Sequence, residues 1–290
     1  MSVRPESPAS APPRGPLPTL SLVTCSFQQG RYLEQTMRSV LDQKYPGLEY
    51  VVIDGGSKDE SVSIIRKYTA ELSYWVSEPD HGQTDALIKG FRRTSGDIMG
   101  WLCSDDLLLP GALATVGRFF ADNPNVMAAY GDALWIDGDG RFIRPKKEAG
   151  FNRFVFLYDH NYVPQPSMFW RRSLHQSVGG LDTRFDLAMD ADLWDRFSQI
   201  TPIARIPAYL SCMRFYPAQK TLSRRGDGRR EDAAIRSRQS EQPGWMNHAL
   251  HFVARGMRVC AKVRQGGYWA AVPAEHIEWL QRSSSTERAG

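Results

Sequence analysis

Cysteine is scarce in this sequence, with four residues in 290. Cys25, Cys103, Cys212 and Cys260 lie far apart in apolar segments, and no two of them form a C-x-x-C pair. The first residues do not have the apolar core of a secretory leader. This pattern favours reduced thiols in a cytoplasmic protein over a disulfide framework or a zinc site.

Long apolar runs and a strong net charge are also missing. No run is long enough to span a bilayer, so an enzyme for lipid-linked substrates would have to reach the membrane from outside it. We therefore expect a cytoplasmic protein whose membrane contact, if it has one, is peripheral and at the inner face of the cell membrane. The net charge is only +4, which is too small to indicate nucleic acid, and we expect no nucleic-acid partner.

The sequence does contain enough apolar material for a folded domain. Hydrophobic residues make up 42% of the chain and aromatic residues 11%, so it can bury a sizeable core. Residues 1–18 are rich in Pro, Ala and Ser and predict a disordered tail. We expect the main domain at residues 19–222, a linker in the basic stretch 223–244 and a helical appendage at 245–290.

The main domain alternates between two hydrophobic periodicities. Short apolar runs at 20–25, 50–53, 74–76 and 98–102 predict strands, and helical spacing fills the intervals between them. This alternation predicts an α/β fold with an open, mostly parallel sheet.

Local signals refine this assignment. Ser57 with Glu60 predicts a capping box at the start of the second helix. The third helix is expected from Thr84 to Gly96. A turn at 137–140 predicts a hairpin, and a later helix is expected to begin near Asp190.

Acidic residues follow three of the predicted strands. They are Asp54, the loop that contains Asp80 and Asp85, and the pair Asp105 and Asp106. Ligands of open α/β sheets collect beyond the carboxyl ends of the strands. A single Asp in such a place is more often a turn or cap residue. Several carboxylates would repel a nucleotide diphosphate unless some contact its base or ribose, or a divalent cation lies between them.

The order and spacing of these motifs resemble glycosyltransferase family 2. The likeness covers roughly residues 20–222. Its motifs are Thr24-Cys25-Ser26, Asp54-Gly55-Gly56-Ser57, Asp80-His81-Gly82-Gln83-Thr84-Asp85, Trp101-Leu102-Cys103-Ser104-Asp105-Asp106, Gln165-Pro166-Ser167, Gly179-Gly180-Leu181-Asp182 and Asp190-Ala191-Asp192-Leu193-Trp194. The resemblance implies a Rossmann-like nucleotide-diphospho-sugar transferase (GT-A) fold, with a mixed, mostly parallel central sheet and flanking helices. It makes 19–222 the catalytic domain.

The resemblance also implies donor-binding and metal-binding residues. Those implied to contact the nucleoside, ribose or phosphates of the donor are Thr24, Ser26, Asp54, Gln83, Asp85, Lys89 and Asp105. Asp106 is the implied ligand of Mn²⁺ or Mg²⁺. Lys89 has an equally strong alternative as an exposed, solvated helical lysine.

Asp190 matches the family's catalytic base, which would take the proton of the acceptor hydroxyl. Gln165, Asp192 and Trp194 are expected on the acceptor side, although a buried Trp is more often part of the core. Two residues depart from the family pattern. Met189 replaces a Glu before the base, and Tyr216 stands where the family often has a His. We therefore expect weak metal affinity.

Three functions remain open from the sequence. The first is inverting transfer of a sugar from a nucleotide diphosphate sugar to a hydroxyl of a saccharide or lipid-linked acceptor, as in cell-envelope or exopolysaccharide biosynthesis. The second is a degenerate glycosyltransferase that serves as a binding or scaffold protein. The third, a nucleotidyltransferase, is disfavoured because no Gly-rich basic loop follows the first strand.

The segment 245–264 carries an apolar stripe that includes Leu250 and Val253. Arg255, Arg258 and Lys262 lie opposite this stripe. Two arrangements are open: the helix rests on an anionic membrane surface, or it docks on the catalytic domain.

Overall fold

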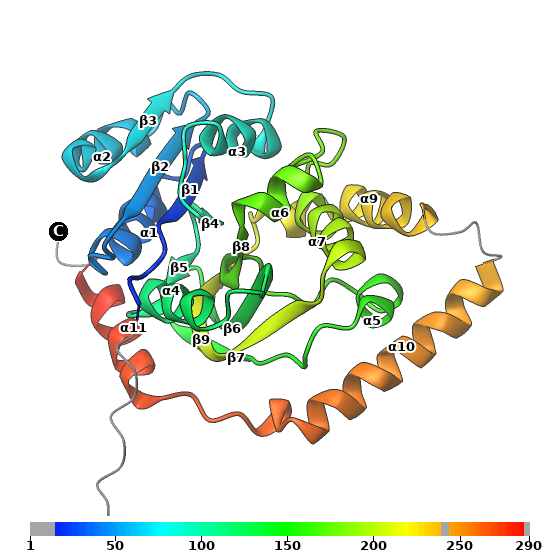
Figure 1. The fold of residues 1–290 in the computed structure, drawn as a ribbon. Coiled ribbons are helices and arrows are strands. Elements are labelled where there is room, and N and C mark those ends of the chain that lie inside the picture. The colour runs from blue at the N-terminus through cyan, green and yellow to red at the C-terminus, as the bar shows by residue number, and fades with distance from the viewer. Residues whose placement is uncertain (1–14, 239–243, 287–290) are drawn as a thin grey trace, which may run out of the picture.

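The computed structural model describes residues 15–238 and 244–286 (Figure 1). Within them nine strands form one mixed sheet, in the order β3-β2-β1-β4-β8-β6-β9-β5, with β7 paired to β6. The strands are β1 (Leu20–Ser26), β2 (Leu48–Asp54), β3 (Tyr74–Ser77), β4 (Ile98–Cys103), β5 (Leu107–Leu108), β6 (Ala128–Asp137), β7 (Phe142–Lys146), β8 (Met168–Arg171) and β9 (Ile203–Phe215). The expected α/β architecture is present.

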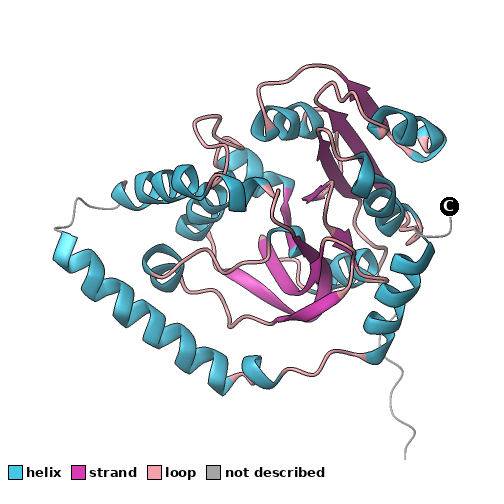
Figure 2. Cartoon of the chain, turned by 180° about the vertical axis from the view of Figure 1, so that it is seen from behind, coloured by secondary structure: helices cyan, strands magenta, loops and turns pink. Residues whose placement is uncertain are grey.

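Helices lie on both faces of this sheet (Figure 2). They are α1 (Gly30–Leu41), α2 (Ser61–Lys67), α3 (Gln83–Phe91), α4 (Ala112–Asp122), α5 (Arg153–Tyr158), α6 (Arg172–Ser177), α7 (Met189–Ile200), α8 (Lys220–Ser223), α9 (Arg225–Ser237), α10 (Gly244–Arg264) and α11 (Ala274–Thr286). The short 3-10 helices are η1 (Thr69–Glu71), η2 (Gln165–Ser167) and η3 (Gly267–Trp269).

The two faces of β1 bury their side chains in different cores. Leu22 packs with α1, α2 and α4, whereas Val23 packs with α3, α5 and α7. Successive side chains of a strand point to opposite faces, so a run of apolar residues is needed where both faces are covered. This is why residues 20–25 are mostly apolar and do not alternate strictly between apolar and polar side chains.

The order of the first four strands positions the candidate site. β1 lies between β2 and β4 and is parallel to both, while β3 extends the parallel part beyond β2. After β1 the chain therefore adds β2 and β3 on one side of this strand and then β4 on the other side. A change of direction of this kind opens a crevice at the carboxyl ends of the strands.

Two predicted helix boundaries are wrong. Helix α2 begins at Ser61 with Glu60 as its N-cap and no side-chain cap, so Ser57 and Glu60 do not form a capping box. The Ser57 hydroxyl donates instead to Asp54, at 2.5 Å. Helix α3 ends at Phe91 rather than near Gly96.

The C-terminal part of the chain is helical and surrounds the main body. Helix α9 occupies much of 223–244, where the sequence predicted a linker, and its Ile235 is buried in the core. Helix α10 follows one side of the molecule beside α5, and α11 returns to pack Leu280 near β5 and β9. Most of the predicted tail, 1–14, lies outside the described residues.

None of the helices that the structure describes combines the length and the apolarity needed to cross a bilayer.

Candidate functional site

Three polar residues meet at the carboxyl ends of the first strands. Ser26, Asp54 and Ser77 are neighbours in register across β1, β2 and β3. The Ser26 hydroxyl is buried without a hydrogen-bond partner among the described residues. A buried hydroxyl is seldom left unpaired, so Ser26 at this position fits contact with a bound polar group.

Asp54 shapes the loop that follows β2. Its Oδ2 accepts hydrogen bonds from Ser77 Oγ (2.6 Å) and from the N–H of Ser57 (2.9 Å), while Oδ1 accepts the Ser57 hydroxyl. The carboxylate is fully buried. A side chain at Gly55 would meet Oδ2 of Asp80 at 2.8 Å, so the loops after β2 and β3 touch there.

Thr24 is placed below this edge rather than at it. Its side chain is fully buried and shares a hydrogen bond of 2.9 Å with the Tyr50 hydroxyl. The structure therefore gives Thr24 a packing role beneath the crevice and leaves no surface for a ligand.

The acidic pair Asp105 and Asp106 follows β4, the strand next to β1. Burial raises the pKa of Asp105, and burial together with the charge of Asp105 raises the pKa of Asp106 well above its ordinary value. A half-buried and a buried carboxylate side by side are favoured in their charged form by a bound cation. The pair therefore fits a hard divalent ion such as Mg²⁺ or Mn²⁺, which prefers carboxylate oxygens.

Two residues of the β9 region hold this pair in place. The N–H of the buried Arg214 donates to Asp106 Oδ1 (2.9 Å), and its guanidinium donates to the carbonyl of Asp105 (2.8 Å). The Tyr216 hydroxyl donates to Asp105 Oδ2 (2.9 Å). Tyr216 thus reaches the acidic pair, as its place in the family pattern implies, but it brings a hydroxyl rather than an imidazole.

Cys103 is a neighbour of the pair that the sequence did not single out. Its Sγ and the carboxylate oxygens of Asp105 and Asp106 lie within 4.8 Å of one another. A hydrogen bond to Cys25, burial and the two carboxylates raise the thiol pKa well above its usual value. A protonated thiol is a poor ligand, so the carboxylates are the stronger candidates for metal binding.

Two glutamines connect Cys103 to the rest of the site. Gln83 Nε2 donates to Cys103 Sγ at 3.2 Å, and Gln165 Nε2 donates to the carbonyl of Trp101 at 2.9 Å. The next residue, Thr84, donates to the carbonyl of Phe185 at 2.7 Å. The first turn of α3 therefore touches both the end of β4 and the segment that leads into α7.

Asp85 and Lys89 pair with each other on the outer side of α3. Lys89 Nζ lies 3.3 Å from Asp85 and 3.2 Å from Glu78, and these ion pairs raise the lysine pKa. Lys89 is therefore half-buried and ion-paired rather than exposed and solvated, and its contact with the donor stays a prediction.

Asp190 lies in the first turn of α7. Asn161 Nδ2 donates to its Oδ2 (2.8 Å), and the N–H of Ala191 donates to its Oδ1 (2.7 Å). Burial, assisted by the nearby charge of Asp232, raises its pKa to about 6 despite these hydrogen bonds. Desolvation of the carboxylate therefore outweighs the effect of the helix N-terminus, which by itself would lower this pKa.

Helix α9 supplies supporting residues that sequence reasoning missed. One oxygen of Glu231 accepts hydrogen bonds from the N–H groups of Asp186 (3.1 Å), Leu187 (2.8 Å) and Ala188 (2.8 Å), just before α7 begins. Lys220 Nζ holds Asp186 from the other side, at 2.7 Å. The expected linker therefore caps the helix that carries Asp190.

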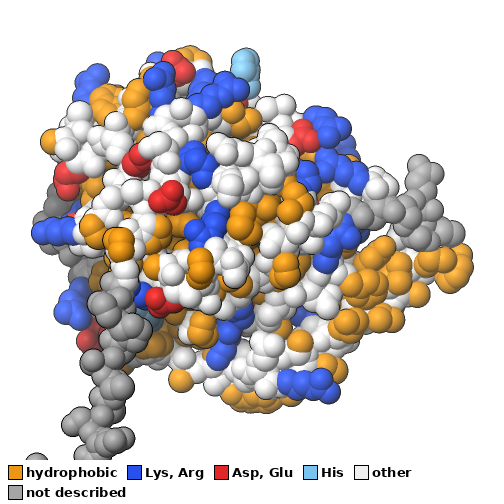
Figure 3. Space-filling view, viewed as in Figure 1, with side chains coloured by type: hydrophobic (Ala, Val, Ile, Leu, Met, Phe, Trp, Pro, Cys, Tyr) orange, Lys and Arg blue, Asp and Glu red, His pale blue; other side chains and the backbone are white. Residues whose placement is uncertain are grey.

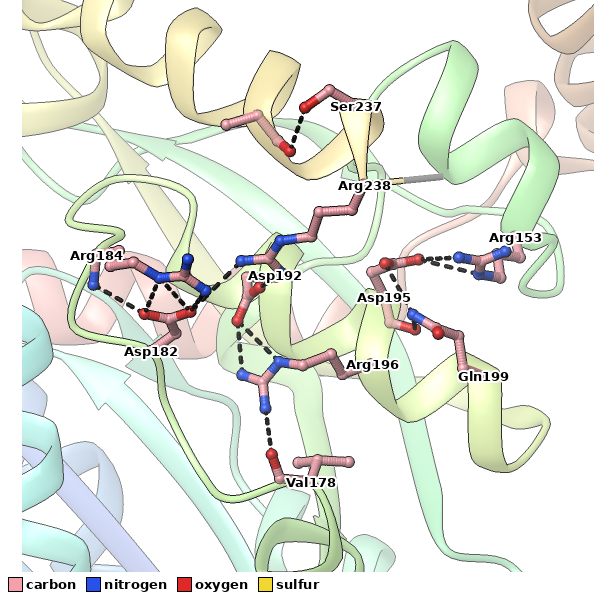
Figure 4. Close-up of polar contacts among 11 residues, drawn as sticks. Arg153, Val178, Asp182, Arg184, Asp192, Asp195, Arg196, Gln199, Ser237 and Arg238 are labelled. Carbon is pink, nitrogen blue, oxygen red and sulfur yellow. Dashed lines mark hydrogen bonds and ion pairs between the residues drawn. The ribbon is translucent and has the colours of Figure 1, made fainter. Parts of the chain in front are cut away.

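Asp192 lies in a different ion cluster. Figure 4 shows its carboxylate between Arg196 and Arg238, with Arg196 at 2.6 Å. Asp182 joins this cluster through Arg184 and Arg238. Since Asp192 is fully buried, its position fits a structural ion pair and not acceptor contact.

Trp194 is also buried completely. Its ring stacks on Trp101 with 5.4 Å between centroids and contacts Trp170 at 5.3 Å. A ring without exposed surface cannot stack on a sugar, so the core alternative holds for Trp194 in this structure.

A hollow of about 1320 Å³ opens elsewhere, along the outer side of α1. Its lining includes Arg31, Arg38, Lys67 and Trp279. None of the predicted site residues contributes to this lining. We therefore locate the site by the polar and acidic side chains at the strand ends and not by the volume of this hollow.

The chain is similar to known glycosyltransferases. The model of glycosyl transferase family 2 matches residues 21–179. A glycosyltransferase of Mycobacterium tuberculosis is 34% identical over 188 residues, which cover 60% of this chain and 67% of the relative. The O-antigen biosynthesis protein RfbC of Myxococcus xanthus is 29% identical over 193 residues, covering 63% of this chain and 15% of that protein.

Solved structures share the fold. Staphylococcus aureus TarS in complex with UDP has a TM-score of 0.61 at 14% identity, with 90% of this chain and 78% of that chain covered. The mannosyltransferase PcManGT of Pyrobaculum calidifontis, in complex with GDP-Man and Mn²⁺, has a TM-score of 0.61 at 17% identity, with 98% and 78% covered. The predicted GT-A fold class is confirmed.

Proposed function

Because this chain belongs to glycosyltransferase family 2, we propose that it transfers a sugar from a nucleotide diphosphate sugar to an acceptor hydroxyl, with inversion at the anomeric carbon. The observation that carries this proposal is the position of the acidic pair Asp105 and Asp106. The pair follows β4, beside β1, where the order in which strands join the sheet changes direction. A crevice of this kind is where open α/β sheets bind nucleotides.

We assign Asp105 and Asp106 as the residues that hold Mn²⁺ or Mg²⁺. The bound Mn²⁺ of the structurally similar PcManGT supports a divalent ion in this fold. Such an ion would stabilise the negative charge on the departing diphosphate. The two carboxylates offer oxygen ligands to such an ion. Their pKa values are raised because burial disfavours the ionised carboxylates, and a bound cation would stabilise these charges.

The donor contacts that we propose run along the strand ends. Ser26 offers a hydroxyl without a hydrogen-bond partner in the described part of the chain, and Gln83, at the start of α3, donates to Cys103. Asp105 has a second role in this assignment, since it also faces the ribose of the donor. Asp54 acts mainly by holding the loop at Gly55, close to which the nucleoside would lie.

Asp190 is the base of the proposed reaction. As the acceptor hydroxyl oxygen bonds to the anomeric carbon, its proton passes to the Asp190 carboxylate and the bond to the diphosphate oxygen breaks. A carboxyl pKa of about 6 suits this role, since the group is ionised at neutral pH and still a stronger base than an ordinary Asp. Asn161 holds one oxygen of the carboxylate at 2.8 Å and so orients it.

The proposed acceptor is a saccharide or a lipid-linked saccharide of the kind used in polysaccharide biosynthesis. The relative that is described as an O-antigen biosynthesis protein supports this class. We propose Gln165 as an acceptor-side residue. Its side chain contacts Cys103, a neighbour of the acidic pair, and the carbonyl of Trp101.

Thermal unfolding in the presence of Mn²⁺ and UDP-, GDP- or dTDP-sugars tests donor binding, because a ligand of the folded state raises its melting temperature. Product formation from the stabilising donor is then measured by mass spectrometry. Asp106→Asn should fold normally and lose transfer, whereas the exposed Asp122→Asn should keep it. Donor binding by the wild type without any transfer or hydrolysis would favour the scaffold alternative.

A further inference from the structure

The inner face of α10 is fixed to the catalytic domain. Ala254 is fully buried, Arg258 Nε lies 2.5 Å from Asp159, and Lys262 Nζ lies 3.1 Å from Glu148. These two cations were expected opposite the apolar stripe, with contact to a membrane surface or to the catalytic domain left open. Their ion pairs show that they belong to the docking contact, which sets the rotation of the helix about its axis.

The outer face of α10 is apolar and exposed. Trp245 and Phe252 each expose 71% of their surface. Other exposed apolar residues of the helix are Val253, Met257, Val259 and Val263, and Trp269 follows in η3 with 74% exposed. Figure 3 shows hydrophobic side chains gathered along this side of the molecule. Contiguous apolar surface of this kind marks an interaction site.

The positions of these residues place them on one stripe. Trp245, Phe252, Val259 and Val263 recur at spacings of seven, seven and four residues, which align along one side of an α-helix. Ala254 and Arg258 lie on the opposite side, against the protein. The helix therefore directs its paired cations Arg258 and Lys262 toward the domain and this apolar stripe outward.

Charge decides which partner this stripe fits. The sequence has no Asp or Glu between Gln242 and Ala274. Arg255 and Arg264 are exposed, and their positions on the helix flank the apolar stripe on its two sides. A second copy of this chain would bring like charges together without acids in this segment to pair them, whereas an anionic lipid surface would be attracted to both.

We propose that the outer face of α10, with Trp269 of η3, binds the surface of a membrane that contains anionic lipids. The apolar stripe lies in the boundary between headgroups and acyl chains, and Arg255 and Arg264 lie among the headgroups. Tryptophan is enriched at that boundary because its ring is amphipathic. Trp245 lies at one end of the exposed stripe, and the exposed Trp269 follows the helix in η3.

Vesicle sedimentation of the full chain tests this proposal. The vesicles consist of phosphatidylcholine alone or of phosphatidylcholine mixed with phosphatidylglycerol. The wild type should sediment with the mixed vesicles and much less with the neutral ones. Phe252→Ser combined with Val259→Ser should weaken the association at least about tenfold, because both side chains lose apolar area that the lipid would bury. Ile200→Ser is the matched control, since Ile200 is 58% exposed at the end of α7.

A second variant separates the charge from the apolar stripe. Arg255→Gln combined with Arg264→Gln should reduce binding to the mixed vesicles and remove most of its dependence on salt. Thermal unfolding of each variant checks that the fold is kept. The proposal is overturned if the wild type stays in the supernatant, or if the Phe252 and Val259 substitutions leave vesicle binding unchanged. It is also overturned if sedimentation in solution shows a dimer that those substitutions convert to a monomer.

Discussion

The Tyr216 hydroxyl donates a hydrogen bond of 2.9 Å to Oδ2 of Asp105. This contact occupies a carboxylate oxygen of the pair that we assign to the metal. It also places residue 216 beside that pair, where an imidazole would be a ligand for a divalent ion. Tyr216→His should therefore tighten Mn²⁺ binding several-fold in the presence of nucleotide diphosphate. Calorimetric titration measures this change.

The control for that variant is Tyr216→Phe, which removes the hydroxyl without adding a ligand. It should not tighten Mn²⁺ binding as the histidine does. Equal Mn²⁺ affinities for the two variants would show that residue 216 lies outside the metal site. Chelation of Mn²⁺ should abolish transfer in the wild type and in both variants.

The rate of transfer should fall on the acid side of about pH 6. Burial and Asp232 raise the Asp190 pKa to about 6, and only the ionised form can accept the acceptor proton. Activity is therefore present above this pH and lost as the pH falls through it. Asp232→Asn should move this limb to lower pH, because it removes a negative charge that favours protonation of Asp190. The measurement is kcat/KM against pH at saturating Mn²⁺.

Asp190→Asn should lower transfer by ~10²-fold or more and leave donor affinity nearly unchanged. Asp192→Asn is the comparison, and its effect should appear in thermal stability because Arg196 and Arg238 lose their shared partner. Normal transfer by Asp190→Asn would assign the base to another residue. Calorimetry with the donor and mass spectrometry of the product give the two readouts.

Glu231→Ala should destabilise the protein by about 1–3 kcal/mol, the scale of leaving buried donors unpaired. The N–H groups of residues 186–188 would lose their acceptor. Transfer should fall as well, since these groups precede the turn that holds Asp190. Arg230→Ala, next in the chain and mostly exposed, should change neither property appreciably. Matching melting temperatures for the two variants would contradict the capping role.

Trp194→Ala should lower the free energy of unfolding by about 3–5 kcal/mol, as truncation of a buried aromatic residue does. The ring stacks on Trp101 inside the core and has no exposed surface. Denaturant unfolding measures the loss. If stability is kept while KM for the acceptor rises, Trp194 belongs to the acceptor site after all.

The parallel part of the sheet and the positions of its acids were predictable from the sequence. Strands buried on both faces require mostly apolar runs, and these runs end at Asp54 and at Cys103, two residues before Asp105. The ends of parallel strands lie on one edge of a sheet, so runs followed by acids locate the site without knowledge of any contact. The complete burial of Thr24 and Trp194 was not predictable from the sequence. Both faces of the sheet are covered, so only the packing of the elements shows which polar or aromatic side chains reach the surface.

The role of residues 225–237 was hidden for a different reason. Helix α9 has a polar composition with one buried apolar residue, Ile235, so its periodicity is weak and its charges suggest a linker. Its position is determined by Glu231 and Arg238, which pair with backbone and side-chain groups far away in the sequence. Similarly, Ser57 and Glu60 have the spacing of a capping box, but Asp54 takes the serine hydroxyl.

The contact between α9 and α7 has a consequence for any shortened version of this protein. A fragment that stops at residue 222, the boundary suggested by composition, would keep Asp190 but lose Glu231 and Arg238. The turn before α7 would then lack its carboxylate acceptor, and the buried Asp192 would keep only Arg196. We therefore propose that the smallest fragment able to fold with an intact catalytic helix extends through Arg238.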